Sequence, residues 1–145
     1  MDIRRAHPTE SDSLAALWIR SRRGSASIPP TVHTDEEVHR WFEEIVFRTC
    51  EVWVATDNGN AVGLMVLDQE WIDQLYVDPG EVGKGVGGAL LGHATRLRPA
   101  GLKLWTFQSN LDARRFYEAH GFVATVTTQG DNEEQAPDVC YEWPS

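Results

Sequence analysis

The sequence predicts an α+β fold: a single mixed, mostly antiparallel β-sheet of about seven strands, with about four helices packed on it. Three observations predict this class. Short β-rich runs alternate along the chain with amphipathic helical stretches. An Asn-Gly pair joins two of the β-rich runs, which is typical of an antiparallel hairpin. Other β-rich runs are separated by helical stretches, which are typical of crossover connections, so the sheet is expected to be mixed.

Length and composition indicate a single domain over residues 1–145. Hydrophobic residues make up 41% of the chain and charged residues 24%, which are ordinary globular values. No run approaches the ~18 consecutive apolar residues of a membrane span, and the first residues lack the apolar core of a signal peptide. Cys50 and Cys140 form no C-x-x-C motif, so we expect reduced thiols in a cytoplasmic protein with no membrane partner.

The net charge of −9 narrows the class of partner. Nucleic acid is not expected, because phosphates bind basic surfaces. A cationic small molecule or peptide is compatible with the acidic charge, although acidic residues also simply keep a protein soluble. The histidines lack metal-ligand spacing, so no metal is expected. These features leave the oligomeric state open, a homodimer included.

The first elements are a short strand over 3–6 and a helix over 10–23. The apolar residues of that helix recur at helical spacing, at Leu14, Leu17 and Trp18. Thr9 is predicted to cap the helix, with Asp12 completing a weak capping box. The segment 24–34 is rich in Gly, Ser and Pro, so it is predicted to be a loop.

A second helix is predicted to open at Thr34, which three acidic residues follow. Its apolar stripe consists of Val38, Trp41, Phe42 and Ile45. Three strands come next, over 51–56, 61–68 and 71–77. Asn58-Gly59 lies between the first two of them and predicts a tight hairpin.

The remaining chain alternates again between helices and strands. A helix over 87–98, a strand over 102–107 and a helix over 110–121 are predicted in that order. Gly121 lies where a left-handed C-terminal cap belongs, which would bring Phe122 back onto Tyr117. Two strands close the chain around an acidic loop, at 122–126 and 139–143 with the loop over 128–138.

A glycine-rich stretch, "VDPGEVGKGVGGALL" (77–91), separates a strand from a helix. Glycines at such a junction permit a tight turn and close helix–strand packing. They also expose successive backbone amides that can bind phosphate oxygens. A Walker A loop is excluded, because Gly85 follows Lys84 where a Ser or Thr is required. A dinucleotide fingerprint fits the spacing of Gly83, Gly85 and Gly88, but the strand ends too early and the acidic residue expected downstream is missing.

The stretch 75–91 resembles the acetyl-CoA-binding motif of the GNAT superfamily of N-acetyltransferases, Gln/Arg-x-x-Gly-x-Gly/Ala, which here falls on 82–87. "NLDARRFYEAHGF" (110–122) resembles the family's second signature, matched at Asn110, Tyr117, Gly121 and Phe122. The order of predicted elements fits this family over nearly the whole chain. Val82 is a departure, since this position is usually Gln or Arg, but the backbone donors at 83–88 remain.

The resemblance implies a seven-stranded sheet whose central strands splay apart to form an acyl-CoA cleft. It implies acetyl-CoA as co-substrate and direct acetyl transfer, in a ternary complex, to a primary amine of a small molecule or peptide. The residues implied to bind acetyl-CoA are Leu75, Tyr76, Val77, Val82, Gly83, Lys84, Gly85, Val86, Gly87, Gly88, Asn110 and Tyr117.

Each candidate catalytic or pantetheine-binding residue also has a structural explanation. Tyr117 matches the family's general acid, but its ring would also pack over Phe122. Asn110 matches a pantetheine contact, but the residue type also suits a helix N-cap. Glu70 and Asp73 are candidate general bases acting through water, or solvated carboxylates at a strand end. In this family the acceptor enters between the first two helices and the last hairpin.

Two other functions remain open at this stage. The first is a degenerate family member that binds acyl-CoA as a sensor without catalysis, which Val82 alone supports. The second is a dinucleotide-binding oxidoreductase, which the weak glycine fingerprint supports.

Overall fold

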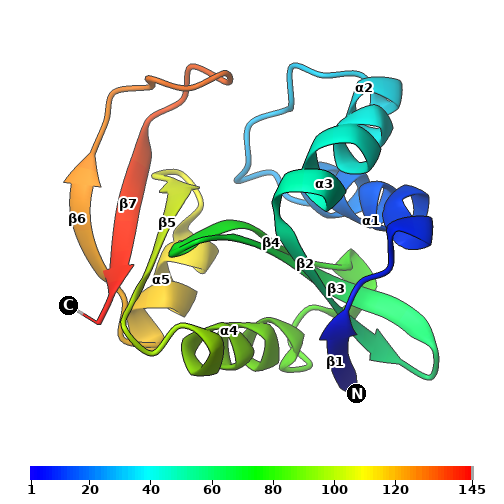
Figure 1. The fold of residues 1–145 in the computed structure, drawn as a ribbon. Coiled ribbons are helices and arrows are strands. Elements are labelled where there is room, and N and C mark those ends of the chain that lie inside the picture. Colours follow the sequence, from blue (N-terminus) through cyan, green and yellow to red (C-terminus); the bar gives the residue numbers. More distant parts are fainter. Residues whose placement is uncertain (145) are drawn as a thin grey trace.

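The computed structural model describes residues 1–144 and contains one seven-stranded sheet (Figure 1). The strand order is β1-β2-β3-β4-β5-β7-β6, and β4 and β5 form the parallel pair in an otherwise antiparallel sheet. The predicted mixed, mostly antiparallel sheet is confirmed. The strands are β1 (Asp2–Arg5), β2 (Glu51–Asp57), β3 (Asn60–Asp68), β4 (Trp71–Val77), β5 (Leu102–Phe107), β6 (Val123–Thr127) and β7 (Asp138–Trp143).

Helices lie on both faces of the sheet. The longer ones are α1 (Ser11–Arg23), α4 (Val86–Leu97) and α5 (Leu111–Ala119). The second predicted helix begins as α2 (Asp35–Trp41), passes through a π-helical turn, η2 (Phe42–Val46), and ends as α3 (Phe47–Thr49). Short 3₁₀ turns, η1 (Pro8–Glu10) and η3 (Pro79–Glu81), precede α1 and the glycine loop. No helix within residues 1–144 is long and apolar enough to cross a membrane.

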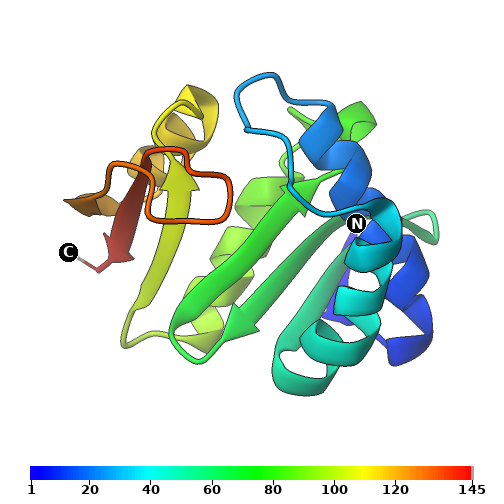
Figure 2. The ribbon, with the colours of Figure 1, turned by 90° about the horizontal axis from the view of Figure 1, so that it is seen from above.

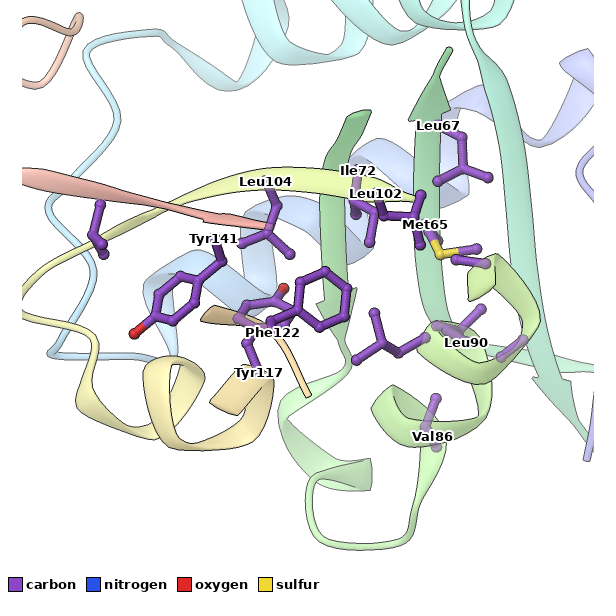
Figure 3. Close-up of a cluster of buried hydrophobic side chains, with 14 of the residues drawn as sticks. Met65, Leu67, Ile72, Val86, Leu90, Leu102, Leu104, Tyr117, Phe122 and Tyr141 are labelled. Atoms are coloured by element: carbon purple, nitrogen blue, oxygen red, sulfur yellow. The ribbon is translucent and has the colours of Figure 1, made fainter. Parts of the chain in front are cut away.

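Two apolar clusters hold the layers together. Above the sheet, α1 to α3 cover β2 and β3 through residues that include Leu17, Phe42 and Val54. Below it, α4 and α5 cover the middle of the sheet and β7, and Figure 3 shows this lower cluster gathered between sheet and helices. Its labelled members include Leu90, Leu104, Tyr117, Phe122 and Tyr141. Because each cluster fixes one helix layer, the strands between them are held at defined positions.

The sheet opens between β4 and β5. These strands pair at Trp71 with Lys103, where the Lys103 amide donates to the Glu70 carbonyl over 2.8 Å, and they then diverge. Figure 2 shows the resulting V from above, with β4 in green and β5 in yellow-green. β5 instead continues alongside β7 over its whole length. The predicted splay of the central strands is confirmed.

Local signals in the sequence were mostly read correctly. Asn58 and Gly59 adopt φ values of 51° and 79°, as a tight hairpin requires. Thr34 caps α2, and Gly121 has a φ of 88°, with the Phe122 amide donating to the Tyr117 carbonyl over 3.0 Å. Cys50 and Cys140 are free thiols.

The predicted cap of the first helix is wrong. Instead of Thr9, the residue that caps this turn is His7, whose ring nitrogen Nδ1 accepts from the Thr9 amide over 3.2 Å. The Glu10 carboxylate accepts in return from the His7 amide over 2.8 Å. Pro8 suits the first position of the 3₁₀ turn, since its missing N–H needs no partner there. The capping box therefore lies two residues earlier than predicted.

Candidate active site

The glycine loop presents unpaired backbone amides to solvent. Gly83 and Gly85 have φ values of 86° and 84°, in the left-handed region that favours glycine, and Gly85 is the N-cap of α4. The first hydrogen bond of α4 runs from the Ala89 amide to the Gly85 carbonyl over 3.0 Å. The amides of Val86, Gly87 and Gly88 therefore have no partner within the helix. Together with the helix dipole, these donors make a cradle suited to an anion.

A cavity of about 560 Å³ lies in front of this cradle. The end of β4, the glycine loop and one side of α5 line it. Packing against α5 does not itself require glycine, because a Cβ on Gly87 or Gly88 would make only ordinary contacts, at 3.4 Å from Phe116 and 3.5 Å from His120. The positive φ values of Gly83 and Gly85 are what require glycine in this loop. Backbone donors beside a long apolar-walled cavity fit a pyrophosphate with an extended arm.

Side chains of the loop contribute unequally to this cavity. Val82 is 69% exposed and lines the cavity without packing into the core. Lys84 points its ammonium to Glu81 over 3.2 Å and does not line the cavity. The Val86 side chain is buried in the lower cluster, so its amide is the group that faces the cradle. The loop therefore presents mainly its main chain to the cavity.

A β-bulge turns the backbone of β4 toward the gap that opens where β4 and β5 diverge. Gln74 pairs with Val66 on β3, whereas Ile72 pairs with Leu67, so Asp73 is the extra residue. The Asp78 amide donates to the Val62 carbonyl over 2.9 Å. Along an antiparallel strand, residues alternate between those whose N–H and C=O groups bond to the neighbouring strand and those whose groups point away from it. Since Asp78 bonds to β3, Leu75 and Val77 point their N–H and C=O groups away from β3 and toward β5. The Val77 carbonyl accepts from the Ser21 hydroxyl over 2.9 Å.

Tyr117 and Asn110 lie where the cavity meets the gap, and each residue lines both spaces. The Tyr117 ring is 7% exposed and packs on Phe122 at 5.7 Å between ring centroids, so the packing role is confirmed. Burial also raises the pKa of the Tyr117 hydroxyl well above its ordinary value. The hydroxyl is therefore protonated at neutral pH, as a proton donor must be. The Asn110 side-chain oxygen accepts from the Ala113 amide over 3.2 Å, so Asn110 is the N-cap of α5.

The two candidate bases are in different places. Asp73, at the bulge, lines the gap. The Asp73 side chain is exposed, but the protein around its carboxylate removes part of the hydration. This desolvation raises the pKa of Asp73 above its ordinary value, and a hydrogen bond from Gln74 lowers it by a smaller amount. Glu70 lies at the closed end of the V, where it lines a separate hollow with Lys103 and Trp143. The structure brings Asp73 and Tyr117 to the same gap and leaves Glu70 apart from them.

A second large cavity, of about 470 Å³, opens on the upper face. It is lined by α1, the α1–α2 loop, α2 and the β6–β7 loop, where sequence analysis expected the acceptor. Its carboxylates are Glu37, Glu44, Glu133 and Glu134, and its aromatic walls are Trp18 and Trp41. Gln74 lines both this cavity and the gap, so the two spaces adjoin at this residue.

Residues 48–124, more than half of the chain, match the acetyltransferase (GNAT) domain family. The chain belongs to the GNAT acetyltransferases. It is 33% identical to the peptidyl-lysine N-acetyltransferase YjaB of Salmonella typhimurium, over 91% of this chain and 90% of the relative. YjaB of Escherichia coli is 29% identical over 91% of this chain and 88% of its own length. The GNAT chain is therefore an acyltransferase, which sets aside the oxidoreductase alternative.

Solved structures agree with this assignment. The solution structure of apo-form YjaB from Escherichia coli superposes with a TM-score of 0.76 at 28% identity, covering 98% of this chain and 96% of that one. A structure of yncA from Salmonella typhimurium with acetyl-CoA gives a TM-score of 0.73, covering 97% of this chain and 91% of that one. Its 17% identity means that this second likeness shows the fold alone.

Several residues that line the gap and the cavities next to it were not found from the sequence. Arg22 is 90% buried by side chain and donates to the Tyr76 hydroxyl over 3.3 Å and to the Glu134 carboxylate over 3.3 Å. Its guanidinium lies over Trp18 at 4.8 Å from the ring centroid. The spacing of Trp18 and Arg22 places both on one helical face, which was the available signal. Nothing local in the sequence indicates Ile28, Gln74 or Glu134.

Proposed function

We propose that this enzyme transfers an acetyl group from acetyl-CoA to the side-chain amine of a lysine in a peptide or protein, by direct transfer in a ternary complex. One observation carries the proposal: the gap between β4 and β5 adjoins the backbone-lined cavity on one side and the carboxylate-bearing cavity on the other, and shares lining residues with each. Two substrates that enter from opposite sides would meet there, which is the arrangement that direct transfer requires. The names of the YjaB relatives support lysine as the acceptor.

On the cofactor side, the chain contributes mainly amides. Those of the glycine loop and the start of α4 would bind the pyrophosphate of acetyl-CoA. The main-chain groups of Leu75 and Val77, turned toward the gap by the bulge, would hold the pantetheine arm as an added strand edge. The bound co-substrate supplies an activated thioester carbonyl. The Leu75 amide is the donor best placed to stabilise negative charge that develops on that carbonyl oxygen.

Proton movements involve the residues of the gap. A neutral lysine amine forms the new C–N bond while the C–S bond of the thioester breaks. The Tyr117 hydroxyl gives its proton to the departing sulfur and regains one from solvent. The amine loses its surplus proton to water, with Asp73 as the carboxylate that lines the gap. No covalent enzyme intermediate is involved.

On the acceptor side, charge and shape suit a lysine. Glu37 and Glu133 pair with His33, and Arg40 also lines the cavity, so Glu44 is the carboxylate we expect to attract the ammonium group. Trp41 would provide the apolar wall for the methylene stem, because the Arg22 guanidinium already lies over the Trp18 ring. The cavity is open to the surface, so a lysine presented on a polypeptide can enter it.

The test is a thiol-release assay with purified protein, acetyl-CoA and matched acceptors: a lysine-containing peptide, the same peptide with its lysine acetylated, and small amines such as spermidine. We expect thiol release and a mass increase of one acetyl group on the unmodified lysine peptide. Calorimetry with acetyl-CoA is run in parallel. Tight binding of acetyl-CoA without transfer to any amine would favour the sensor alternative, and transfer to spermidine alone would replace peptide lysine by a small polyamine.

A further inference from the structure

The gap between β4 and β5 is narrow. Its cavity volume is about 90 Å³, against about 560 Å³ for the cofactor cavity that leads into it. Measured in the same way, the gap therefore offers about one sixth of the room of the cofactor cavity. An acyl group that reaches from the cofactor cavity into the gap is therefore limited in length by the far wall of the gap.

The walls of the gap are mostly parts of the rigid fold. They come from β4, β5 and α5 with its N-cap, and Ile72 and Leu104 among them are at least 95% buried in the lower cluster. Such side chains cannot move without disturbing the core. Ile28 is different, because it comes from the loop between α1 and α2. Because Ile28 is half-buried and belongs to neither apolar cluster, it can change without removing part of the core.

Ile28 lies at the junction of three cavities. It lines the gap, the cofactor cavity and a hollow of about 470 Å³ beneath the α1–α2 loop, which shares Trp18 and Arg22 with the acceptor cavity. The loop is tied down on both sides of this residue. The Ser109 hydroxyl donates to the Ser27 carbonyl over 2.8 Å, and Arg22 donates to the Pro29 carbonyl over 3.1 Å. Ile28 is thus held in place where the gap, the cofactor cavity and the hollow beneath the loop meet.

We propose that Ile28 sets the upper size limit of the acyl group, so that the enzyme uses acetyl-CoA in preference to propionyl- and butyryl-CoA. The proposal rests on the proposed function, since it assigns the gap to the acyl group. The sec-butyl side chain of Ile28 closes the space that a third or fourth acyl carbon would need. An apolar pocket discriminates one methylene by about 10–200-fold, which sets the scale of the preference.

The experiment compares acetyl-, propionyl- and butyryl-CoA on the whole protein. Binding is measured by calorimetry, and kcat/KM is measured with a lysine peptide. The variants are Ile28→Ala, which shortens this side chain, and Ile28→Phe, which enlarges it. Val32→Ala is the matched control, because Val32 is on the same loop, is 61% exposed and lines none of the three cavities.

The wild-type protein is expected to favour acetyl-CoA over propionyl-CoA by at least ~10-fold in kcat/KM. Ile28→Ala should reduce that ratio by about ten-fold and tighten butyryl-CoA binding, while Ile28→Phe should weaken acetyl-CoA binding relative to free CoA. Val32→Ala should leave every ratio unchanged. The proposal fails if Ile28→Ala retains the wild-type ratios, or if the control shifts them equally.

Failure of the proposed function gives a different pattern. If no acyl group reaches any amine, the lysine acetyltransferase assignment is wrong, whatever the Ile28 variants do. The binding ratios among the three acyl-CoA esters still test Ile28 in that case, because they need no acceptor. Should Ile28→Ala unfold the loop, Ile28→Val and Ile28→Phe must move the ratios in opposite directions for the proposal to stand.

Discussion

The cofactor cavity and the acceptor cavity differ in how the chain builds them, although their volumes, about 560 and 470 Å³, are similar. The cofactor side is made largely from one continuous stretch, from the end of β4 through the glycine loop to α4, and it presents backbone amides. The acceptor side is made from four segments far apart in the sequence, and it presents carboxylates and indole rings. One site is built from main chain and the other from side chains.

This difference explains which of the two cavities can be predicted from the sequence. A backbone site needs glycines at fixed spacing, because a Cβ or an unsuitable φ would close it, so it leaves a motif in the sequence. A side-chain site needs residues that converge in space, and Arg22 meets Glu134 across 112 positions of chain. Perturbing the two sides should accordingly give effects of different kind and size.

The largest effect is expected from Gly85→Asp on the cofactor side. The substitution forces a side chain onto a φ of 84° and places a carboxylate beside the anion cradle. Two like charges ~4 Å apart repel by about 4 kcal/mol at an effective dielectric of 20. Calorimetry should show acetyl-CoA affinity reduced by more than ~100-fold, because each 1.4 kcal/mol is a factor of ten.

Gly59→Asp is the matched control for that variant. Gly59 has a φ of 79°, and a Cβ there also meets open space, but it belongs to the β2–β3 hairpin away from both cavities. The two variants therefore share the backbone strain and the added charge. Equal acetyl-CoA affinity in Gly85→Asp, Gly59→Asp and wild type would show that the glycine loop is not the cofactor site.

Tyr117→Phe should give the next largest effect, on rate alone. The ring and its packing on Phe122 remain, while the hydroxyl proposed to protonate the sulfur is lost. General acid catalysis is worth about 10²–10⁴-fold, so kcat should fall at least ~10-fold even with water in place of the hydroxyl. Affinity for acetyl-CoA should change little.

The pH dependence sharpens this prediction for Tyr117. A raised pKa means that the acid form is present below the folded pKa and is lost only as the pH rises through it. The ratio of the wild-type to the Tyr117→Phe rate should therefore be constant between pH 7 and pH 9, since tyrosine ordinarily titrates near ~10. Equal kcat in the two proteins would leave Tyr117 with packing alone.

The fold and the conformation of the glycine loop were predictable because their signals are local. Alternation, the Asn58-Gly59 turn, the Thr34 cap and the left-handed Gly121 each depend on a few neighbouring residues. The position of the bulge at Asp73 could not be predicted in this way. It depends on the register between β3 and β4, and register depends on packing across the sheet. Glu70 and Asp73 are three positions apart but line different hollows, Glu70 at the closed end of the V and Asp73 in the gap itself.

Glu44→Gln tests the acceptor side, where a smaller effect is expected. Glu44 is an exposed carboxylate of that cavity, and the adjacent Glu43 is exposed but does not line it. An exposed charge pair is worth about 0.2–1 kcal/mol, so KM for a lysine peptide should rise by roughly two- to five-fold, with kcat unchanged. The rise should shrink at high salt because such pairs are screened. Glu43→Gln should have no effect, and a matching rise there would reduce Glu44 to general surface charge.

Val82→Arg is expected to have the smallest effect, and of opposite sign. The position usually carries Gln or Arg in this family, and here its side chain is 69% exposed at the edge of the cofactor cavity. If the main chain provides most of the pyrophosphate contacts, restoring the side chain adds only one exposed pair. Such a pair contributes ~0–1 kcal/mol, so acetyl-CoA should bind between equally well and about five-fold tighter. Calorimetry at low and high salt would measure this gain in affinity, since it should disappear when charge is screened.

A gain of ~100-fold would mean that the side chain, rather than the backbone, dominates this site, and the contrast between the two cavities would fail. A loss of affinity in a folded Val82→Arg protein would instead mean that the apolar side chain itself contacts the cofactor.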